Sequence, residues 1–152
     1  MAETADIPGV LNLIREFADY EDLRKHLEVT DEKLKDVMFS ENSFVKGLVA
    51  FDDQTPIGYA LFYPSFLSFK GQRSIYLEDI FITKKYRKHG IGKKLLNEVA
   101  KYGKEIGAVR MDFQVLDWNL PAKHFYKKHG AITDNEERHF KFVDKEFEKL
   151  SR

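Results

Sequence analysis

Cysteine is missing from this chain of 152 residues. Without a thiol, the protein has no disulfide, no thiolate metal site and no cysteine nucleophile. The five histidines, at positions 26, 89, 124, 129 and 139, lack the spacing of metal ligands, so we predict no bound metal. The serine nucleophile motif G-x-S-x-G is also absent, which argues against covalent catalysis of that kind.

A net charge and a long apolar run are missing as well. Lysine and arginine total 25, and aspartate and glutamate also total 25. A dedicated nucleic-acid-binding protein usually carries a basic excess, so we expect no nucleic-acid partner. The first six residues are acidic and lack the basic and apolar regions of a signal peptide. The uncharged stretch 55–69 contains two prolines and is too short to span a bilayer, so we expect a cytoplasmic protein without a membrane partner.

Aromatic residues, in contrast, are plentiful: 13 Phe, seven Tyr and one Trp. A disordered chain could not bury so much aromatic surface, and the length fits one globular domain over residues 1–152. Charge is uneven along it, with thirteen acids and six bases in residues 1–60 but eight bases and two acids in residues 84–105. The distribution indicates a cation-attracting and an anion-attracting region, unless both are simply solvated helix faces.

Hydrophobic periodicity predicts helices over 7–20, 31–38, 90–102 and 119–129. Alternating or continuous apolar runs predict strands over 44–51, 57–66, 74–83, 110–115 and 140–143. Thr30 and Asn119 are suitable N-caps, and Gly103 is expected to close the third helix. This order of elements predicts an α+β fold with a mixed sheet and helices on its faces.

The segment 86–96 joins a predicted strand to a predicted helix through a basic turn that contains Gly90 and Gly92. Glycine lets the backbone approach a ligand closely, and the first N–H groups of a helix lack internal partners. A phosphate or pyrophosphate fits such a turn. The P-loop and the dinucleotide-binding fingerprint are both absent, so an ordinary strand–helix turn remains the alternative.

Two spaced motifs extend this pattern. Arg87-x-x-Gly90-x-Gly92 resembles the R/Q-x-x-G-x-G/A signature of the acetyl-CoA-dependent N-acetyltransferases of the GNAT superfamily, and Asn119-x-x-Ala122-x-x-x-Tyr126 resembles its second cofactor segment. The flanking residues are similar to the spermidine/spermine N-acetyltransferases and their thialysine-acetylating relatives; they are Tyr20-Glu21, Tyr76-Leu77-Glu78-Asp79, Trp118-Asn119 and Phe125-Tyr126-Lys127. The resemblance covers essentially the whole chain.

The resemblance implies a mixed, mostly antiparallel central sheet and acetyl-CoA as the bound cofactor. Its cofactor contacts map onto the backbone of Ile80, Phe81 and Ile82, onto the turn residues Arg87, Lys88, His89, Gly90, Ile91, Gly92 and Lys93, and onto Asn119, Leu120, Pro121, Ala122 and Tyr126. The chain departs from the family's pattern at two places. The family's N-terminal edge strand is expected to be missing or cut to a stub, and Lys88 stands where the polyamine branch usually has glycine.

Acetyl transfer to an amine needs a neutral nucleophile. An alkylamine is neutral in about one part in a thousand at pH 7.4, so deprotonation costs about 4 kcal/mol and calls for a base, directly or through water. Glu78, just before the turn, is the carboxylate best placed for this role. The alternatives are that Glu78 only binds the cationic substrate or that it forms a structural ion pair.

Tyr126 is the candidate acid for the leaving thiolate, because the family uses the matching tyrosine in that way. A core tyrosine beside Phe125 is the alternative. Asn119 caps its helix and, by the resemblance, also binds the pantetheine arm. The resemblance further implies substrate contacts at Tyr20, Glu21, Glu78, Asp79, Asp112, Phe113 and Gln114.

These residues predict direct transfer of an acetyl group to a primary amine of a polyamine or diamine. The alternative acceptor is thialysine or another lysine-like small amine, whose carboxylate Arg24 or Lys25 could bind; a non-catalytic CoA-binding module or a nucleic-acid-associated adaptor is a further alternative. The resembled branch forms intertwined dimers, and the aromatic C-terminal region with Phe140, Phe142 and Phe147 is apolar enough to need covering. We therefore expect a homodimer.

Overall fold

The structure is a computed structural model that describes residues 1–151, and it consists of two compact units. The first unit, Met1–Gln114, contains the sheet, and the second begins at Val115. No helix of the described residues is long and apolar enough to cross a membrane. The expectation of a single domain over residues 1–152 stays a prediction.

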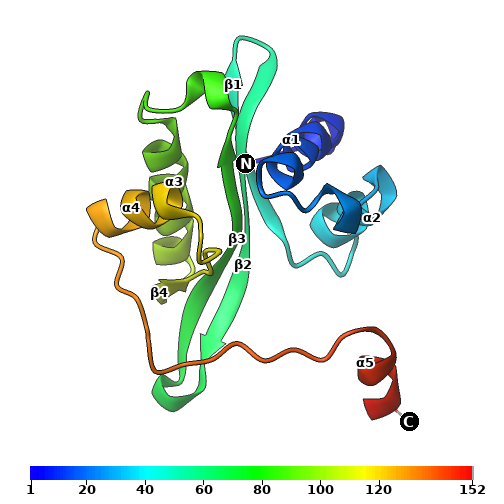
Figure 1. Ribbon diagram of the computed structural model, residues 1–152, viewed down its shortest axis with the longest axis vertical. Helices are drawn as coiled ribbons and strands as arrows, with labels where there is room; N and C mark the ends of the chain where they lie inside the picture. The colour runs from blue at the N-terminus through cyan, green and yellow to red at the C-terminus, as the bar shows by residue number, and fades with distance from the viewer. Residues whose placement is uncertain (152) are drawn as a thin grey trace. The chain divides into compact units, whose positions relative to one another are not determined.

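Four strands form one sheet in the order β1-β2-β3-β4. They are β1 (Lys46–Asp52), β2 (Thr55–Leu67), β3 (Gln72–Ile82) and β4 (Ala108–Asp112). β1 and β2 pair antiparallel, as do β2 and β3, whereas β4 pairs parallel to β3. The prediction of a mixed, mostly antiparallel sheet is confirmed (Figure 1).

Two helices, α1 (Ile7–Tyr20) and α2 (Asp31–Phe39), cover one face of the sheet, and α3 (Ile91–Glu105) covers the other (Figure 1). Apolar residues of α1 recur at helical spacing and are buried against the sheet. Thr30 begins α2 as predicted, because its hydroxyl accepts a hydrogen bond from the backbone N–H of Lys33.

The core on the α1 and α2 face contains Tyr59, Leu61 and Phe81 from β2 and β3. On the opposite face Phe62 packs edge-on against Tyr102 of α3, with ring centroids 5.3 Å apart. The sequence predicts that Gly103 closes α3, but this prediction is wrong, because Gly103 lies inside the helix. A Cβ at Gly103 would lie 3.1 Å from the Ile75 side chain, so a glycine here allows α3 to approach β3 closely.

The second unit contains α4 (Leu120–Lys128) and α5 (Asp144–Leu150). The strand predicted over 140–143 is wrong, since this segment has no regular structure and α5 follows it. Phe140 and Phe142 alternate with polar residues, which is the pattern of a strand, but a strand also needs a paired backbone. Alternation alone therefore misled the prediction.

The first residues of the chain approach the outer edge of β1. The backbone N–H of Ala2 donates to the carbonyl oxygen of Gly47 over 2.7 Å. This single bond stands where the sequence predicted a stub of an edge strand. The other boundaries differ from the predictions by a few residues, most at β4, which begins at Ala108 and ends at Asp112.

Candidate active site

A β-bulge on β3 determines where the Glu78 side chain lies. Leu61 pairs with Asp79 and Phe62 pairs with Leu77, so Glu78 is the extra residue of β3. A bulge breaks the alternation of side chains and re-aims one of them. Glu78 and Asp79, although adjacent in sequence, therefore both reach the face of the sheet that α1 and α2 cover, where Glu78 contacts Tyr63 and Asp79 contacts Tyr59.

Asp79 is half-buried and is held by a tyrosine from the neighbouring strand. The hydroxyl of the fully buried Tyr59 donates to its Oδ2 over 3.2 Å. Burial, and then the nearby charge of Glu78, raise the pKa of Asp79 to about 6, although the Tyr59 hydrogen bond acts in the opposite direction. Burial and the charge of Asp79 raise the pKa of Tyr59 well above its usual value, so Tyr59 remains a donor at neutral pH.

Tyr63 and Tyr76 stack beside the exposed Glu78, with ring centroids 5.3 Å apart. The Tyr63 hydroxyl makes a long hydrogen bond of 3.5 Å to Glu78 Oε2. Burial, followed by the charge of Glu78, raises the pKa of Tyr63 to about 12, and the same causes raise that of Tyr76. Sequence reasoning missed Tyr59 and Tyr63. The available signal was their spacing, which puts both tyrosines on one face of β2, although they pair with Phe81 and Tyr76 and not with the acidic residues of β3.

The end of α1 brings Tyr20 and Glu21 toward this cluster. The charge of Glu21 raises the pKa values of both Asp79 and Tyr59, although less than burial does. Tyr20 lies under the Arg87 guanidinium, with 4.6 Å from Arg87 Cζ to the ring centroid. The structure therefore brings together four of the predicted acceptor residues, namely Tyr20, Glu21, Glu78 and Asp79.

The Arg87 side chain is held within the first unit. Its guanidinium lies 5.2 Å from the Phe81 ring centroid, and Nε donates to the carbonyl oxygen of Ile82 over 2.8 Å. A hydrogen bond between Thr83 Oγ1 and Glu16 Oε2 joins the same region to α1. The guanidinium therefore holds α1 and the end of β3 together, which leaves the backbone of Arg87 for the predicted cofactor contact.

The glycine turn has the shape of an anion site. Gly90 is the N-cap of α3 with φ of +79°, and no side chain caps this helix end. A Cβ at Gly90 would meet no atom within 4 Å, which is the open space that a ligand approaching the backbone requires. Lys88 has φ of +67°, a conformation that favours glycine, which explains why its position suits glycine in the resembled branch.

Next to the turn, β3 presents an open edge. β4 pairs with β3 at Arg73, Ile75 and Tyr76, and no pairing of the two strands extends beyond Tyr76 in the described part of the chain. The predicted pantetheine-binding stretch Ile80–Ile82 therefore lies on β3 past its pairing with β4. Backbone groups at such an edge can pair with an extended ligand as an added strand does.

Asp112 lies at the end of β4. Its carboxylate receives hydrogen bonds from Ser74 Oγ over 3.0 Å and from Arg110 Nε over 2.9 Å. The Arg110 guanidinium offsets the charge of Asp112, and its substrate contact stays a prediction. Phe113 is half-buried and Gln114 exposed, and their substrate role stays a prediction. Arg24, a candidate for binding a carboxylate, forms an ion pair with Asp19 at 2.8 Å.

The second unit contains the second motif. Asn119 is buried and caps α4 as predicted, since its Oδ1 accepts from the backbone N–H of Ala122 over 3.2 Å. Leu120 and Pro121 begin this helix. Tyr126 is half-buried and packs edge-on against Phe125, with centroids 5.2 Å apart. The cofactor role of Asn119–Ala122 and the acid role of Tyr126 stay predictions from the motif.

Among residues 1–151, no group of three or more histidine, cysteine or acidic side chains could hold a metal ion. The acetyltransferase (GNAT) family matches residues 8–131. The chain therefore belongs to the GNAT family of acetyltransferases, and it is an N-acetyltransferase that acts on an amine.

Two curated relatives and one solved structure illustrate the likeness. Thialysine N-epsilon-acetyltransferase of Bos taurus is 37% identical over 161 residues, which cover 99% of this chain and 94% of that protein. Spermidine/spermine N(1)-acetyltransferase-like protein 1 of Homo sapiens is 31% identical over 138 residues, or 86% of this chain and 20% of that protein. An integron cassette protein of V. cholerae shares the fold at a TM-score of 0.82, with 24% identity, 99% of this chain covered and 94% of that one.

Proposed function

We propose that this enzyme transfers an acetyl group from acetyl-CoA to the terminal amine of thialysine or a similar lysine-like small molecule. One observation carries the proposal: the bulge at Glu78 gathers Glu78 and Asp79 of β3 and Tyr63 of β2 on one face of the sheet, where β3 leads to its open edge and the glycine turn. A cationic amine is attracted to the carboxylates, and the turn suits a pyrophosphate.

When bound, acetyl-CoA supplies the activated acetyl group. We assign the backbone of Ile80–Ile82 to its pantetheine arm and the turn from Arg87 to Lys93 to its pyrophosphate. An N–H of the Ile80–Ile82 stretch is placed to donate to the developing oxyanion. Glu78 takes the proton from the ammonium group, directly or through water, because its exposed carboxylate can exchange protons with solvent. Tyr126 is assigned as the acid.

Asp79 differs from Glu78 in its surroundings. The hydroxyl of the buried Tyr59 donates to the Asp79 carboxylate, which limits the movement of that side chain. We assign Asp79, Tyr20 and Glu21 to binding the ammonium group before it loses its proton. A tyrosine face and carboxylates both stabilise a cation.

The acceptor is assigned from the relatives together with the site. A relative that covers nearly the whole chain is named for thialysine, whereas the relative named for spermidine and spermine is less similar. We therefore place thialysine-like amines before the polyamines, which reverses the order favoured by the acidic N-terminal region. The gathered carboxylates keep di- and polyamines as the second candidate.

The experiment that tests the proposal measures kcat/KM for thialysine, spermidine and putrescine at equal ionic strength. CoA release from acetyl-CoA is the readout, and Glu78→Gln is the control for the base. We expect thialysine to be preferred at least tenfold and Glu78→Gln to lower kcat with an unchanged affinity for CoA. A tenfold preference for spermidine would transfer the assignment to polyamines, and no turnover with any amine would contradict it entirely.

A further inference from the structure

A hollow of about 320 Å³ lies beside Glu78 in the first unit. Among the described residues, Glu78 contributes one carboxylate to its lining and the other six lining residues are apolar or aromatic; they are Leu34 and Val37 of α2, Phe44 and Val45 before β1, and Leu61 and Tyr63 of β2. The Tyr63 hydroxyl and the Glu78 carboxylate are thus the polar side-chain groups of its lining. The hollow begins at the residue that we assign as the base.

The lining has the wrong chemistry for a second cation. An ammonium group that leaves water needs a carboxylate or several hydrogen-bond acceptors to replace its hydration. Glu78 supplies one carboxylate, which we assign to the reacting amine. Asp79 contacts the buried Tyr59 and does not line the hollow. A methylene chain or a thioether gains free energy in such surroundings, because its apolar surface leaves water.

We propose that this hollow receives the uncharged part of the acceptor next to the reacting ammonium group, so that the enzyme selects amines in which a methylene or thioether chain separates that group from any further charge, as it does in thialysine. The inference rests on the proposed acetylation at Glu78 and deepens it. It excludes acceptors with a second ammonium group within the part of the chain that enters the hollow, as in spermidine, and it admits simple alkylamines.

A matched pair of acceptors tests this inference. Heptylamine and N-propyl-1,3-diaminopropane have the same length and differ in one CH₂, which is NH₂⁺ in the second compound. We expect kcat/KM to be at least tenfold higher for heptylamine with the wild-type enzyme. Equal values, or a preference for the diamine, would overturn the inference.

Substitutions at Val37 test whether this hollow is responsible, since Val37 is half-buried in its wall. Val37→Phe fills the space, so we expect at least a tenfold loss in kcat/KM for heptylamine and less than a twofold change for ethylamine, which is too short to enter. Val37→Asp adds a second carboxylate and should favour the diamine. Unchanged selectivity in a folded Val37→Phe enzyme contradicts the inference, even if Val37→Asp does not fold.

Calorimetry separates this inference from the proposed function. Binding of the two amines is measured in the presence of CoA, where no turnover occurs. Tighter binding of heptylamine supports the proposed role of the hollow, even if the enzyme acetylates none of the amines. A lack of acetylation would contradict only the proposed function. Equal or weaker binding of heptylamine, with thialysine acetylated, contradicts the hollow and leaves the acetylation proposal in place.

Discussion

At the scale of single residues, the site depends on how each carboxylate is surrounded. Glu78 is exposed beside two tyrosines, whereas Asp79 is half-buried and accepts a hydrogen bond from Tyr59. Neighbouring acids in one sequence thus differ in hydration, and a difference in hydration changes pKa. We propose that this pair divides the tasks of binding a cation and accepting its proton.

The raised pKa of Asp79 predicts a pH-dependent stability. The folded protein holds a proton on Asp79 up to a pH of about 6, while the unfolded chain releases it near 3.8, so the free energy of unfolding falls as pH rises between these values. Asp79→Asn removes the free-energy cost of ionising this partly buried carboxyl group. We expect the variant to gain stability relative to the wild type from pH 4 to pH 7, by at most about 3 kcal/mol.

Urea unfolding of both proteins at several pH values measures this difference. Asp112→Asn is the control, because it makes the same substitution at a carboxylate that forms an ion pair with Arg110. A difference between wild type and Asp79→Asn that stays constant across this range would show that Asp79 titrates normally.

Tyr126 provides the second prediction at this scale. Tyr126→Phe keeps the ring that packs against Phe125 and removes only the hydroxyl. If Tyr126 protonates the leaving thiolate, we expect kcat to fall at least tenfold, with the Kd for CoA and the KM for the amine unchanged. A rise in the amine KM with an unchanged kcat would make Tyr126 a substrate contact instead.

At the scale of elements, α1 and the cofactor turn are joined by side chains. Arg87 lies against Tyr20 of α1 and Phe81 of β3, and Phe17 of α1 stacks on Phe81 with centroids 5.2 Å apart. The helix end that carries Glu21 is therefore attached to the strand that leads into the glycine turn. Cofactor and acceptor sites share this connection.

Arg87→Gln tests this connection. Glutamine satisfies the R/Q-x-x-G-x-G/A motif and keeps the backbone, but it lacks a cation to lie over Tyr20. We expect the amine KM to rise about fivefold and the Kd for CoA to change less than twofold. Tyr20→Leu should raise the amine KM similarly, and the double variant should add little. A loss of CoA affinity without a change in the amine KM would assign the guanidinium to the cofactor.

The glycine turn has a matched control within the chain. Gly90→Val and Gly71→Val both place a β-branched residue at a positive φ, +79° and +60°, where a Cβ meets no atom within 4 Å. Both variants should lose similar stability, but only Gly90→Val projects a side chain toward the predicted pyrophosphate. We expect its affinity for CoA to fall more than tenfold, about 1.4 kcal/mol or more.

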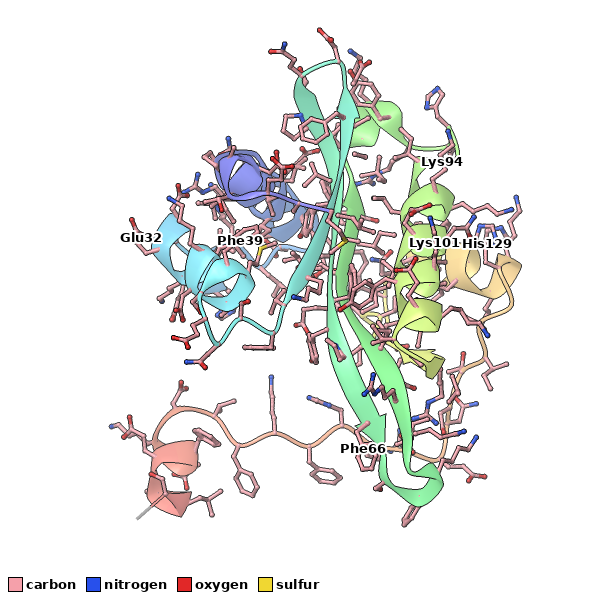
Figure 2. The ribbon with its side chains drawn as sticks, turned by 180° about the vertical axis from the view of Figure 1, so that it is seen from behind. Glu32, Phe39, Phe66, Lys94, Lys101 and His129 are labelled. Carbon is pink, nitrogen blue, oxygen red and sulfur yellow. The ribbon has the colours of Figure 1, made fainter. Side chains whose placement is uncertain are left out.

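Titration calorimetry with CoA measures both affinities. Gly71 lies in the turn between β2 and β3, near the end of the hairpin where Figure 2 labels Phe66. An affinity lost equally in both variants would point to general destabilisation and would remove the turn from the site.

At the scale of the whole molecule, the C-terminal region leaves aromatic side chains exposed. Phe140 is 87% exposed, and Phe142 and Phe147 are each 66% exposed. Large apolar side chains in one segment are typical of a surface that another chain covers. The predicted homodimer provides such a cover, with the second copy as the partner.

Light scattering at micromolar concentration tests the dimer. We expect a mass near twice that of the 17.8 kDa chain, and a monomer when Phe140 and Phe142 are both replaced by serine. Lys141→Ser, between the two aromatic positions, is the control and should remain dimeric. A monomeric wild-type protein would contradict the prediction.

The sequence by itself determined the motifs and most of the helices and strands of this protein. Helix caps at Thr30 and Asn119, and the glycine turn before α3, are local features, because capping and turn conformation depend on residues a few positions apart. The family followed from two spaced motifs. Local patterns therefore predicted the fold class and most of the residues proposed for the site.

Only the tertiary structure decided how those residues meet. The bulge that turns Glu78 toward Tyr63, the contact of Asp79 with Tyr59 and the contact of Arg87 with Tyr20 all depend on strand register and helix packing. Register is set by pairing between distant segments, which a single sequence does not display. The absence of a strand at 140–143 has the same cause, since a strand exists only where another backbone pairs with it.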